Sequence, residues 1–345
     1  MKIFLDDSQC RQNLFPFTHT RHAADIRIGI LTIKEKWEKL INEQVYTSIP
    51  GNIDNYIKIS ANLIPTIENY QAILNDPSTE KADGNVFRSL EYPWHIFQLN
   101  DWAIRQDFQL LTNGRKSAKI SDTNSCINTN DIFIEETATV EHCIINASAG
   151  PVYFGKNCTV MEGSLIRGPF AIGEGATLKM GSKVYGATTI GPYCIAGGEI
   201  KNSVMFGHSN KAHDGYLGDS VIGAWCNLGA GTSNSNIKNT AGEVKYRISS
   251  NRESIAAGNK AGLLMGDYSR AAINTSFNTG TVVGVCCNIF GNNFPGKYVP
   301  NFSWGDERYD LDKAIKDIRN WKMMKGQDIS EQETDLLKKL YQSNF

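Results

Sequence analysis

The stretch 154–190, FGKNCTVMEGSLIRGPFAIGEGATLKMGSKVYGATTI, has an apolar residue at every sixth position. An α-helix repeats every 3.6 residues and an ordinary strand every two, so neither explains a six-residue period. Each hexad is therefore interpreted as a short strand and a corner, with its apolar side chain pointing into a stacked prism. The predicted inward positions are Phe154, Val160, Ile166, Ile172, Leu178, Val184 and Ile190.

A second periodic position supports the prism. Four residues after each apolar position the side chain is small, except at Phe170. Glycine, which tolerates dihedral angles that other residues avoid, follows the apolar residue at intervals of 18 residues, at Gly155, Gly173 and Gly191. Because 18 residues make three hexads, the pattern predicts one triangular coil per three repeats. The small positions are Cys158, Ser164, Ala176, Ser182, Thr188 and Cys194.

The repeat extends beyond this stretch in both directions. A weaker pair precedes it at Ile134 and Val140, and a second block follows at Met265, Ala271, Phe277, Val283 and Ile289. The sequence therefore predicts a mainly β protein with a parallel β-helix over 130–294. Two interruptions, 207–215 and 237–262, are expected to be loops, and loops on a repeat protein often contain binding residues.

The flanking segments lack the six-residue period. Residues 1–100 are expected to form a short α/β domain, in which 25–39 begins as a strand and continues as a helix. Residues 101–129 are interpreted as a linker. In the tail, 295–345, amphipathic helices are expected at 312–325 and 330–341, covering the open end of the β-helix.

Composition limits the classes of function. The net charge of −1 gives no global field to attract nucleic acid or an anionic membrane, so an anionic ligand needs locally placed cations. The eight cysteines show no CxxC pair, which predicts small buried residues in a reducing cytosol and no metal site. Acids in the first seven residues and the lack of a long apolar run predict a cytoplasmic protein.

One segment is more specific than the repeat. Residues 211–219 read KAHDGYLGD and 227–232 read NLGAGT. They resemble the acetyltransferase half of the bifunctional N-acetylglucosamine-1-phosphate uridylyltransferase/glucosamine-1-phosphate acetyltransferase family. The detailed resemblance covers 181–236, the hexapeptide repeat of the acyltransferase superfamily covers 130–294, and the whole chain resembles a shorter, divergent bacterial branch. Because right-handed crossovers are the general rule, the left hand of the coil is implied by this resemblance alone.

The resemblance implies roles for individual residues. His213 matches the general base that takes the proton of the attacking amine, and the backbone amide of Ala230 matches the donor that polarises the thioester carbonyl. Lys201 and Lys183 match the family's phosphate-binding lysine and arginine, although lysine cannot make a bidentate contact. The alternative for both is a solvated lysine. The sugar-contacting positions are Tyr216, Asn227 and Asn236, and asparagines also stabilise β-helix turns without a ligand.

The amino-terminal segment has a resemblance of its own. Residues 11–18, RQNLFPFT, are similar to the arginine–leucine–proline–leucine–threonine signature of sugar-phosphate nucleotidyltransferases, with Arg11 inside the motif and Arg21 at the place of a later lysine. The preceding segment, LDDSQC, has two acids and lacks the glycines that bring backbone amides to phosphates. We therefore expect a docking or oligomerisation domain, with Arg11 and Arg21 as weak nucleotide-binding candidates. Mg²⁺ is implied only if nucleotidyl transfer is retained.

Together these features predict an acetyl-CoA-dependent N-acetyltransferase acting on an amino-sugar phosphate such as glucosamine 1-phosphate, in the supply of nucleotide-sugar precursors for the cell envelope. The resemblance also implies a homotrimer with acyl-CoA bound between neighbouring β-helices. Two alternatives stay open: a sugar-1-phosphate nucleotidyltransferase of the UDP-N-acetylglucosamine pyrophosphorylase type, and a non-catalytic trimeric scaffold. After Asn236 the sequence departs from the family pattern, which leaves the identity of the sugar open.

Overall fold

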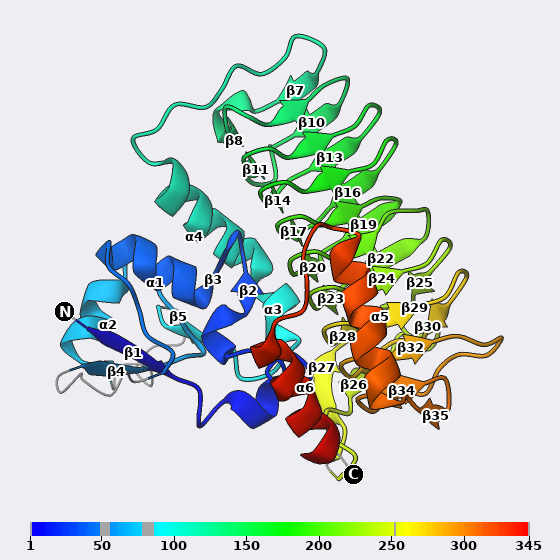
Figure 1. Cartoon of the computed structure of the whole chain (residues 1–345). Helices are drawn as coiled ribbons and strands as arrows, with labels where there is room; N and C mark the ends of the chain where they lie inside the picture. Colours follow the sequence, from blue (N-terminus) through cyan, green and yellow to red (C-terminus); the bar gives the residue numbers. More distant parts are fainter. Residues whose placement is uncertain (1, 49–55, 78–85, 252, 344–345) are drawn as a thin grey trace.

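A computed structural model describes residues 2–48, 56–77, 86–251 and 253–343. The largest part is a left-handed parallel β-helix whose short strands stack coil upon coil (Figure 1). Its strands form three sheets, which we call face 1, face 2 and face 3. The predicted fold class is confirmed.

The strands of each face pair in parallel with those of the neighbouring coils. Face 1 consists of β7 (Ser125–Ile127), β10 (Ile144–Asn146), β13 (Leu165–Arg167), β16 (Lys183–Tyr185), β19 (Glu199–Lys201) and β22 (Tyr216–Gly218). Face 2 consists of β8 (Ile132–Ile134), β11 (Val152–Phe154), β14 (Phe170–Ile172), β17 (Thr188–Ile190), β20 (Val204–Met205), β23 (Val221–Ile222), β28 (Leu263–Met265), β31 (Thr281–Val283) and β33 (Tyr298–Val299).

Face 3 is the longest sheet and ends with one antiparallel strand. Its members are β9 (Thr139–Val140), β12 (Thr159–Val160), β15 (Thr177–Leu178), β18 (Ile195–Ala196), β21 (Asn210–Lys211), β24 (Asn227–Leu228), β29 (Arg270–Ala271), β32 (Asn288–Ile289), β34 (Ser303–Trp304) and β35 (Glu307–Arg308). Two short pairs lie outside the faces: β25 (Ser233–Asn234) with β30 (Ser276–Phe277), and β26 (Val244–Tyr246) with β27 (Ile255–Gly258).

The inward positions predicted from the six-residue period form the core of the prism. Val160 is paired with Leu178 on the next coil, and both side chains are almost completely buried. Phe277 in the second block is 1% exposed. Stacking like residues above one another buries a continuous narrow core, which is how a repeat protein replaces a globular centre.

The amino-terminal segment is a small α/β unit. It contains the parallel pair β1 (Ile3–Asp6) and β4 (Ile57–Ser60), the hairpin β2 (Arg27–Ile28) and β3 (Leu31–Thr32), and the pair β5 (Leu63–Ile64) and β6 (Arg88–Ser89). Its helices are α1 (Ile33–Ile41), α2 (Tyr70–Asn75), α3 (His95–Gln98) and α4 (Asn100–Thr112). The strand-then-helix segment expected at 25–39 is thus a hairpin followed by α1, and the interval interpreted as a linker holds most of α4 as well as β7.

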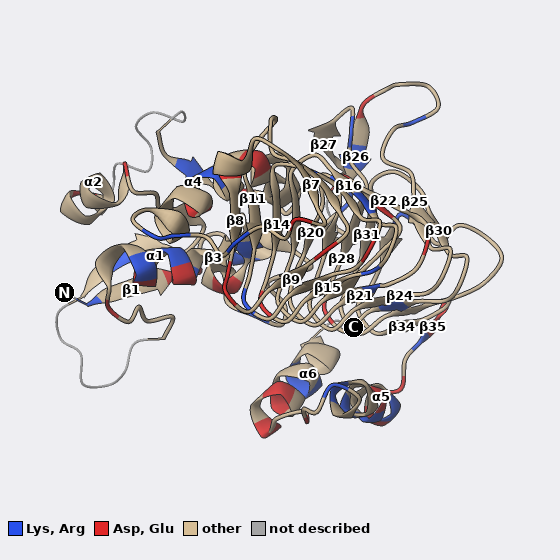
Figure 2. Ribbon diagram, turned by 90° about the horizontal axis from the view of Figure 1, so that it is seen from above, with Lys and Arg blue, Asp and Glu red and all other residues tan. Residues whose placement is uncertain are grey.

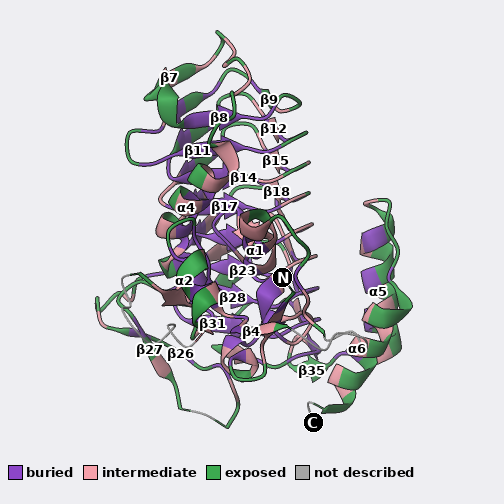
Figure 3. Cartoon of the chain, turned by 90° about the vertical axis from the view of Figure 1, so that its left-hand side faces the viewer, coloured by how far each residue is buried: buried purple, intermediate pink, exposed green. Residues whose placement is uncertain are grey.

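This unit packs against the outer side of face 2 (Figure 3). Phe17 lies against Phe206 with ring centroids 5.2 Å apart, and both are buried. Asn100 donates to the carbonyl oxygen of Ala187 at 2.8 Å, and its own side-chain oxygen accepts from the amide of Gly29 at 2.8 Å. Apolar contact and satisfied buried polar groups therefore join the two parts.

Two helices end the chain, α5 (Leu311–Met323) and α6 (Glu331–Ser343), close to the expected ranges. The expectation that they cover the open end of the β-helix is wrong, because both helices lie beside the coils (Figure 2). Lys325, just after α5, donates from Nζ to the carbonyl oxygen of His208 at 2.8 Å and to Oδ1 of Asn210 at 2.9 Å. The helices pack at this position because aromatic corner residues of successive coils, including Trp225 and Tyr268, provide an apolar surface for them.

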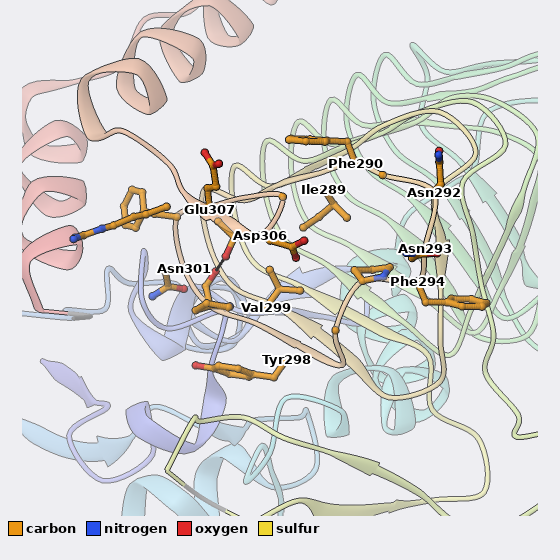
Figure 4. A pocket seen from close by; sticks show the side chains of 18 residues that line it. Ile289, Phe290, Asn292, Asn293, Phe294, Tyr298, Val299, Asn301, Asp306 and Glu307 are labelled. Carbon is orange, nitrogen blue, oxygen red and sulfur yellow. Dashed lines mark hydrogen bonds between the residues drawn. The ribbon is translucent and has the colours of Figure 1, made fainter.

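The far end of the β-helix is left as a hollow of about 410 Å³ (Figure 4). Core residues Ile289 and Val299 form part of its lining, together with the loop 290–296. Strands β33 and β34 extend faces 2 and 3 beyond residue 294, so the coil continues past the expected boundary. Along the described chain, no helix is both long enough and apolar enough to cross a bilayer.

Candidate functional site

His213 lies at the corner where the chain leaves face 3 at Lys211 and enters face 1 at Tyr216. We call this the site corner; it comprises residues 212–215. The corner of the preceding coil is so close that a Cβ on Gly198 would lie 2.8 Å from the carbonyl oxygen of His213, and Gly198 has a φ of +75°. On the following coil the amide of Gly231 donates to the carbonyl oxygen of Asp214 at 3.0 Å. Three stacked corners therefore bring His213 and Ala230 onto adjacent coils.

The His213 side chain is exposed, and within the described chain no hydrogen bond to its imidazole is observed. The ring is thus open to an incoming substrate. Its position is set by the backbone of the site corner rather than by a side-chain partner. An accessible imidazole of this kind can accept a proton from a bound amine.

Face 1 presents its outward side chains in two columns beside the site corner. Lys183, Glu199 and Tyr216 follow one another in the first column. Tyr185 and Lys201 are neighbours in the second. The resemblance had not indicated Tyr185 or Glu199, because their roles depend on which strands become neighbours.

A hydrogen bond links the two columns. The Tyr185 hydroxyl donates to Oε1 of Glu199 at 2.6 Å, and this bond to a carboxylate raises the pKa of Tyr185 to about 12. Lys201 places Nζ 5.8 Å from the centre of the Tyr185 ring. The Glu199 carboxylate therefore lies between Lys183 and Tyr216 in the first column, on the same strand as Lys201.

Tyr216 and Asn236 are in direct contact. Asn236 donates from Nδ2 to the Tyr216 hydroxyl at 3.1 Å and to Oδ2 of Asp219 at 2.5 Å, while Asn202 donates to Oδ1 of Asp219 at 2.7 Å. Gly218 leaves room for the tyrosine, since a Cβ there would lie 2.3 Å from the Tyr216 hydroxyl oxygen. Burial raises the pKa of Tyr216 above its usual range, so the hydroxyl stays protonated and can donate a hydrogen bond.

Asn227 is on the other side of the corner. It belongs to face 3, where its Oδ1 accepts from Asn210 at 3.4 Å, and Asn210 in turn accepts from Lys325. Within one chain the structure therefore does not bring Asn227 together with Tyr216 and Asn236.

Arg11 and Arg21 have partners inside the chain. Arg11 forms an ion pair with Asp7 at 2.7 Å and donates to the backbone oxygen of Arg21 at 3.1 Å. The Arg21 guanidinium is ion-paired with Asp267 on the β-helix and lies 4.8 Å from the Phe206 ring centre. In this arrangement Arg21 joins the two parts of the chain, a long-range pairing that no local motif reveals.

His208, five residues before His213, is stacked between Tyr193 and Trp225, with ring centroids 5.0 and 4.2 Å away. Burial, reinforced by Lys325 and Lys322, lowers the pKa of His208 to about 4. In the described part of the chain, no three His, Cys, Asp or Glu side chains are grouped so that they could hold a metal ion.

The structure thus has two parts. One is a β-helix built on a six-residue repeat, with His213 at one of its corners, and the other is a small α/β segment packed on one face. Residues 2–61 match a family model described as sugar nucleotidyl transferase. The bifunctional protein GlmU of Methanocaldococcus jannaschii is 36% identical over 91 residues, which are 26% of this chain and 22% of that protein. Each of these similarities covers only part of the chain.

A second relative has the same two-part description. The bifunctional sugar-1-phosphate nucleotidylyltransferase/acetyltransferase of Sulfurisphaera tokodaii is 36% identical over 93 residues, or 27% of this chain and 23% of that protein. The match with each of these two curated relatives thus spans less than a quarter of that relative's length.

Two solved structures match the chain at low sequence identity. The hexapeptide transferase family protein from Anaplasma phagocytophilum has a TM-score of 0.27 and 14% identity, covering 64% of this chain and 87% of that one. The Arabidopsis UDP-N-acetylglucosamine acyltransferase has a TM-score of 0.33 and 14% identity, covering 65% and 90%.

Proposed function

We propose that the chain is an acetyl-CoA-dependent N-acetyltransferase acting on an amino-sugar phosphate such as glucosamine 1-phosphate. The observation that carries the proposal is the site corner. It presents the exposed imidazole of His213 next to the outward columns of face 1, which contain Lys201 and the bonded pair Tyr216 and Asn236.

In this reaction the sugar amine attacks the thioester carbonyl while His213 takes the amine proton. The carbon–nitrogen bond forms, the carbon–sulfur bond breaks, and the thiolate leaves as coenzyme A. The backbone amide of Ala230, on the adjacent coil, donates to the oxyanion that develops on the carbonyl oxygen. The close stacking of the corners that contain His213 and Ala230 supports these two roles.

The remaining residues bind the substrate. Lys201, with Lys183 further along the face, neutralises the phosphate. Tyr216 donates to a sugar hydroxyl, and Asn236, which donates to the Tyr216 hydroxyl and to Asp219, holds it at the sugar site. Glu199, at a Cα position paired with Lys183 and with Tyr216, is suited to attract the ammonium form of the amino sugar before its proton is lost.

A neighbouring copy would complete the site. Asn227 on face 3 and Tyr216 on face 1 lie on opposite sides of one corner, so a homotrimer that sets face 3 of one copy against face 1 of the next would bring them together. Acetyl-CoA would then bind between adjacent β-helices. Face 1 is also rich in exposed apolar side chains, with Ile127, Ile144 and Leu165 each between 43% and 53% exposed.

The test is thiol release from acetyl-CoA with a panel of amino-sugar phosphates. Replacing His213 by alanine should lower kcat by about 10²- to 10⁴-fold, the usual contribution of a general base. His142 offers a matched control, because it is an exposed histidine at the same kind of corner on an earlier coil. Equal activity of His213→Ala and the wild type on a confirmed substrate would place the base elsewhere. If the wild type releases no thiol with any member of the panel, the alternative of a non-catalytic trimeric scaffold is favoured.

The match of residues 2–61 to a sugar nucleotidyl transferase family supports a second candidate function, nucleotide binding by the amino-terminal unit. A hollow of about 330 Å³ lies near the carboxyl ends of β1 and β4, lined in part by Gln9, Asn13 and Ser60. The described lining contains no lysine or arginine to balance a triphosphate, and the described acids do not group as Mg²⁺ ligands. Calorimetric titration with UTP tests this candidate: a measurable heat would support it, and its absence would favour a docking role.

A further inference from the structure

Lys211 occupies an inward position of the β-helix. Its Cα pairs with Ala196 on the preceding coil, and Ala196 pairs with Leu178, so the lysine stands in a column of core residues. Its side chain is 1% exposed, against an expectation that buried lysines are rare. Placing an amine in an apolar core costs free energy unless its donors are satisfied.

The amine is satisfied by two backbone carbonyls. Lys211 Nζ donates to the oxygen of His213 at 2.5 Å and to the oxygen of Gly197 at 3.2 Å. These groups belong to two stacked corners, the site corner and the corner immediately before it. The lysine therefore ties the backbone of His213 to the preceding coil from the inside of the prism. The low-dielectric surroundings lower the pKa of Lys211 to about 8.

The two corners are in close contact, so the hydrogen bonds from Lys211 can fix the backbone of one corner relative to the other. A Cβ on Gly197 would lie 2.5 Å from the oxygen of Ala212, and a Cβ on Gly198 would lie 2.8 Å from the oxygen of His213. Only glycine lets the corners approach this closely. Since the described chain makes no hydrogen bond to the imidazole, the position of the ring depends on this backbone.

We propose that Lys211 is a positioning residue, which holds the backbone of the site corner from inside the β-helix so that His213 meets the substrate amine. The inference rests on the proposed function for its kinetic consequence. Its structural part, the tie between two corners, stands independently of any reaction. Lys211 touches neither substrate nor reacting atoms, so its effect has to pass through His213.

The variant Lys211→Met keeps the length of the side chain and removes its donors. We expect kcat to fall about 10- to 100-fold with KM for the amino-sugar phosphate within about twofold, because binding groups on face 1 are untouched. Amide hydrogen exchange at 212–215 should become faster. Leu178→Met, in the same inward column, is the matched control and should change neither quantity. Should Lys211→Met fail to fold, Lys211→Gln, which keeps a donor, replaces it.

A double-mutant cycle separates positioning from a general structural effect. In a His213→Ala background, Lys211→Met should lower kcat no further, since the residue acts through the histidine. A full additional loss in that background would overturn the inference. So would unchanged hydrogen exchange at 212–215.

Failure of the inference is distinguishable from failure of the proposed function. If the wild type is active, His213→Ala is impaired and Lys211→Met keeps wild-type turnover, the function stands and the positioning role falls. If the wild type releases no thiol, the proposed function falls, and hydrogen exchange alone decides whether Lys211 fixes the corner.

Discussion

Lys211 and His213 are two residues apart, yet one is sealed inside the prism and the other is open to solvent. The contrast follows from local geometry. The inward position of a strand is followed by a corner whose side chains project away from the core. A charged donor inside and a base outside can then share one backbone carbonyl, that of His213.

The lowered pKa of Lys211 predicts a pH-dependent stability. An unfolded lysine keeps its proton up to about pH 10.4, whereas the folded residue loses its proton near pH 8. Between these values the unfolded state binds more protons, so the free energy of unfolding rises with pH, by at most about 1.4 kcal/mol per pH unit. Urea unfolding of the wild type and Lys211→Met at pH 7, 8, 9 and 10 should show this rise in the wild type only. If the free energies of unfolding of the two proteins change with pH in the same way, the lowered pKa of Lys211 is contradicted.

Lys201 should affect binding rather than chemistry. Replacing it by alanine removes a cation that meets the phosphate before reaction, and we expect KM to rise about 5- to 30-fold with little change in kcat. Initial-rate measurements over a range of sugar-phosphate concentrations check this. Lys156→Ala, an exposed lysine away from face 1, is the control. A fall in kcat at constant KM would assign Lys201 to the transition state instead.

The sequence predicted the inward residues from Phe154 to Ile190 because an apolar core accepts few alternatives. It did not reveal Lys211, since Lys211 follows Ala196 by 15 residues instead of 18, and counting in sixes loses the register at that shortened coil. Tyr216 and Asn236 came from the family resemblance, whereas the contact between them depends on coil stacking. Asp267, the ion-pair partner of Arg21, lies 246 residues away along the chain and leaves no local signal.

At the scale of elements, the carboxy-terminal helices were predictable from their amphipathic pattern, but their docking site was not. They pack against corner residues such as Trp225, Tyr268 and Phe302, which have left-handed φ values of 56° to 61° and fall outside the inward positions of the repeat. Lys322 lies 5.1 Å from the Trp225 ring centre, and Glu333 of α6 accepts a hydrogen bond from Tyr268 at 2.9 Å.

Because His208 is stacked at the site where α5 and α6 pack, the stability of the protein should fall at low pH. Burial first, and then Lys325 and Lys322, lower the pKa of His208 from 6.5 to about 4. An unfolded histidine takes up a proton as the pH falls below about 6.5 while the folded one stays neutral, so stability falls between pH 6.5 and 4. Comparing urea midpoints at pH 7 and 4.5, His208→Phe should lose less stability than the wild type by about 1 to 3 kcal/mol. His142→Phe, at an exposed corner, should behave like the wild type.

In the described part of the molecule, the segments that cover the β-helix lie on face 2 and beside the corner between faces 2 and 3. The amino-terminal unit packs on face 2, and α5 and α6 lie beside the corner between faces 2 and 3 (Figures 2 and 3). Face 1 keeps apolar residues exposed on its first three strands, β7, β10 and β13, whereas the site corner adjoins β22 at the other edge of the same sheet. Exposed apolar surface on one face of a β-helix is a feature that favours self-association.

Face 1 should form the contact between copies of the chain. Purified protein should sediment as a trimer at micromolar concentration, and Ile144→Glu should dissociate it, because a charge would replace a 52% exposed apolar side chain on face 1. Met324→Glu, a 78% exposed residue near the end of α5, should leave the trimer intact. If copies complete each other's sites, thiol release should fall together with the trimer fraction. Wild-type sedimentation as a stable monomer with full activity would show that face 1 is not the contact and that one chain holds the entire site.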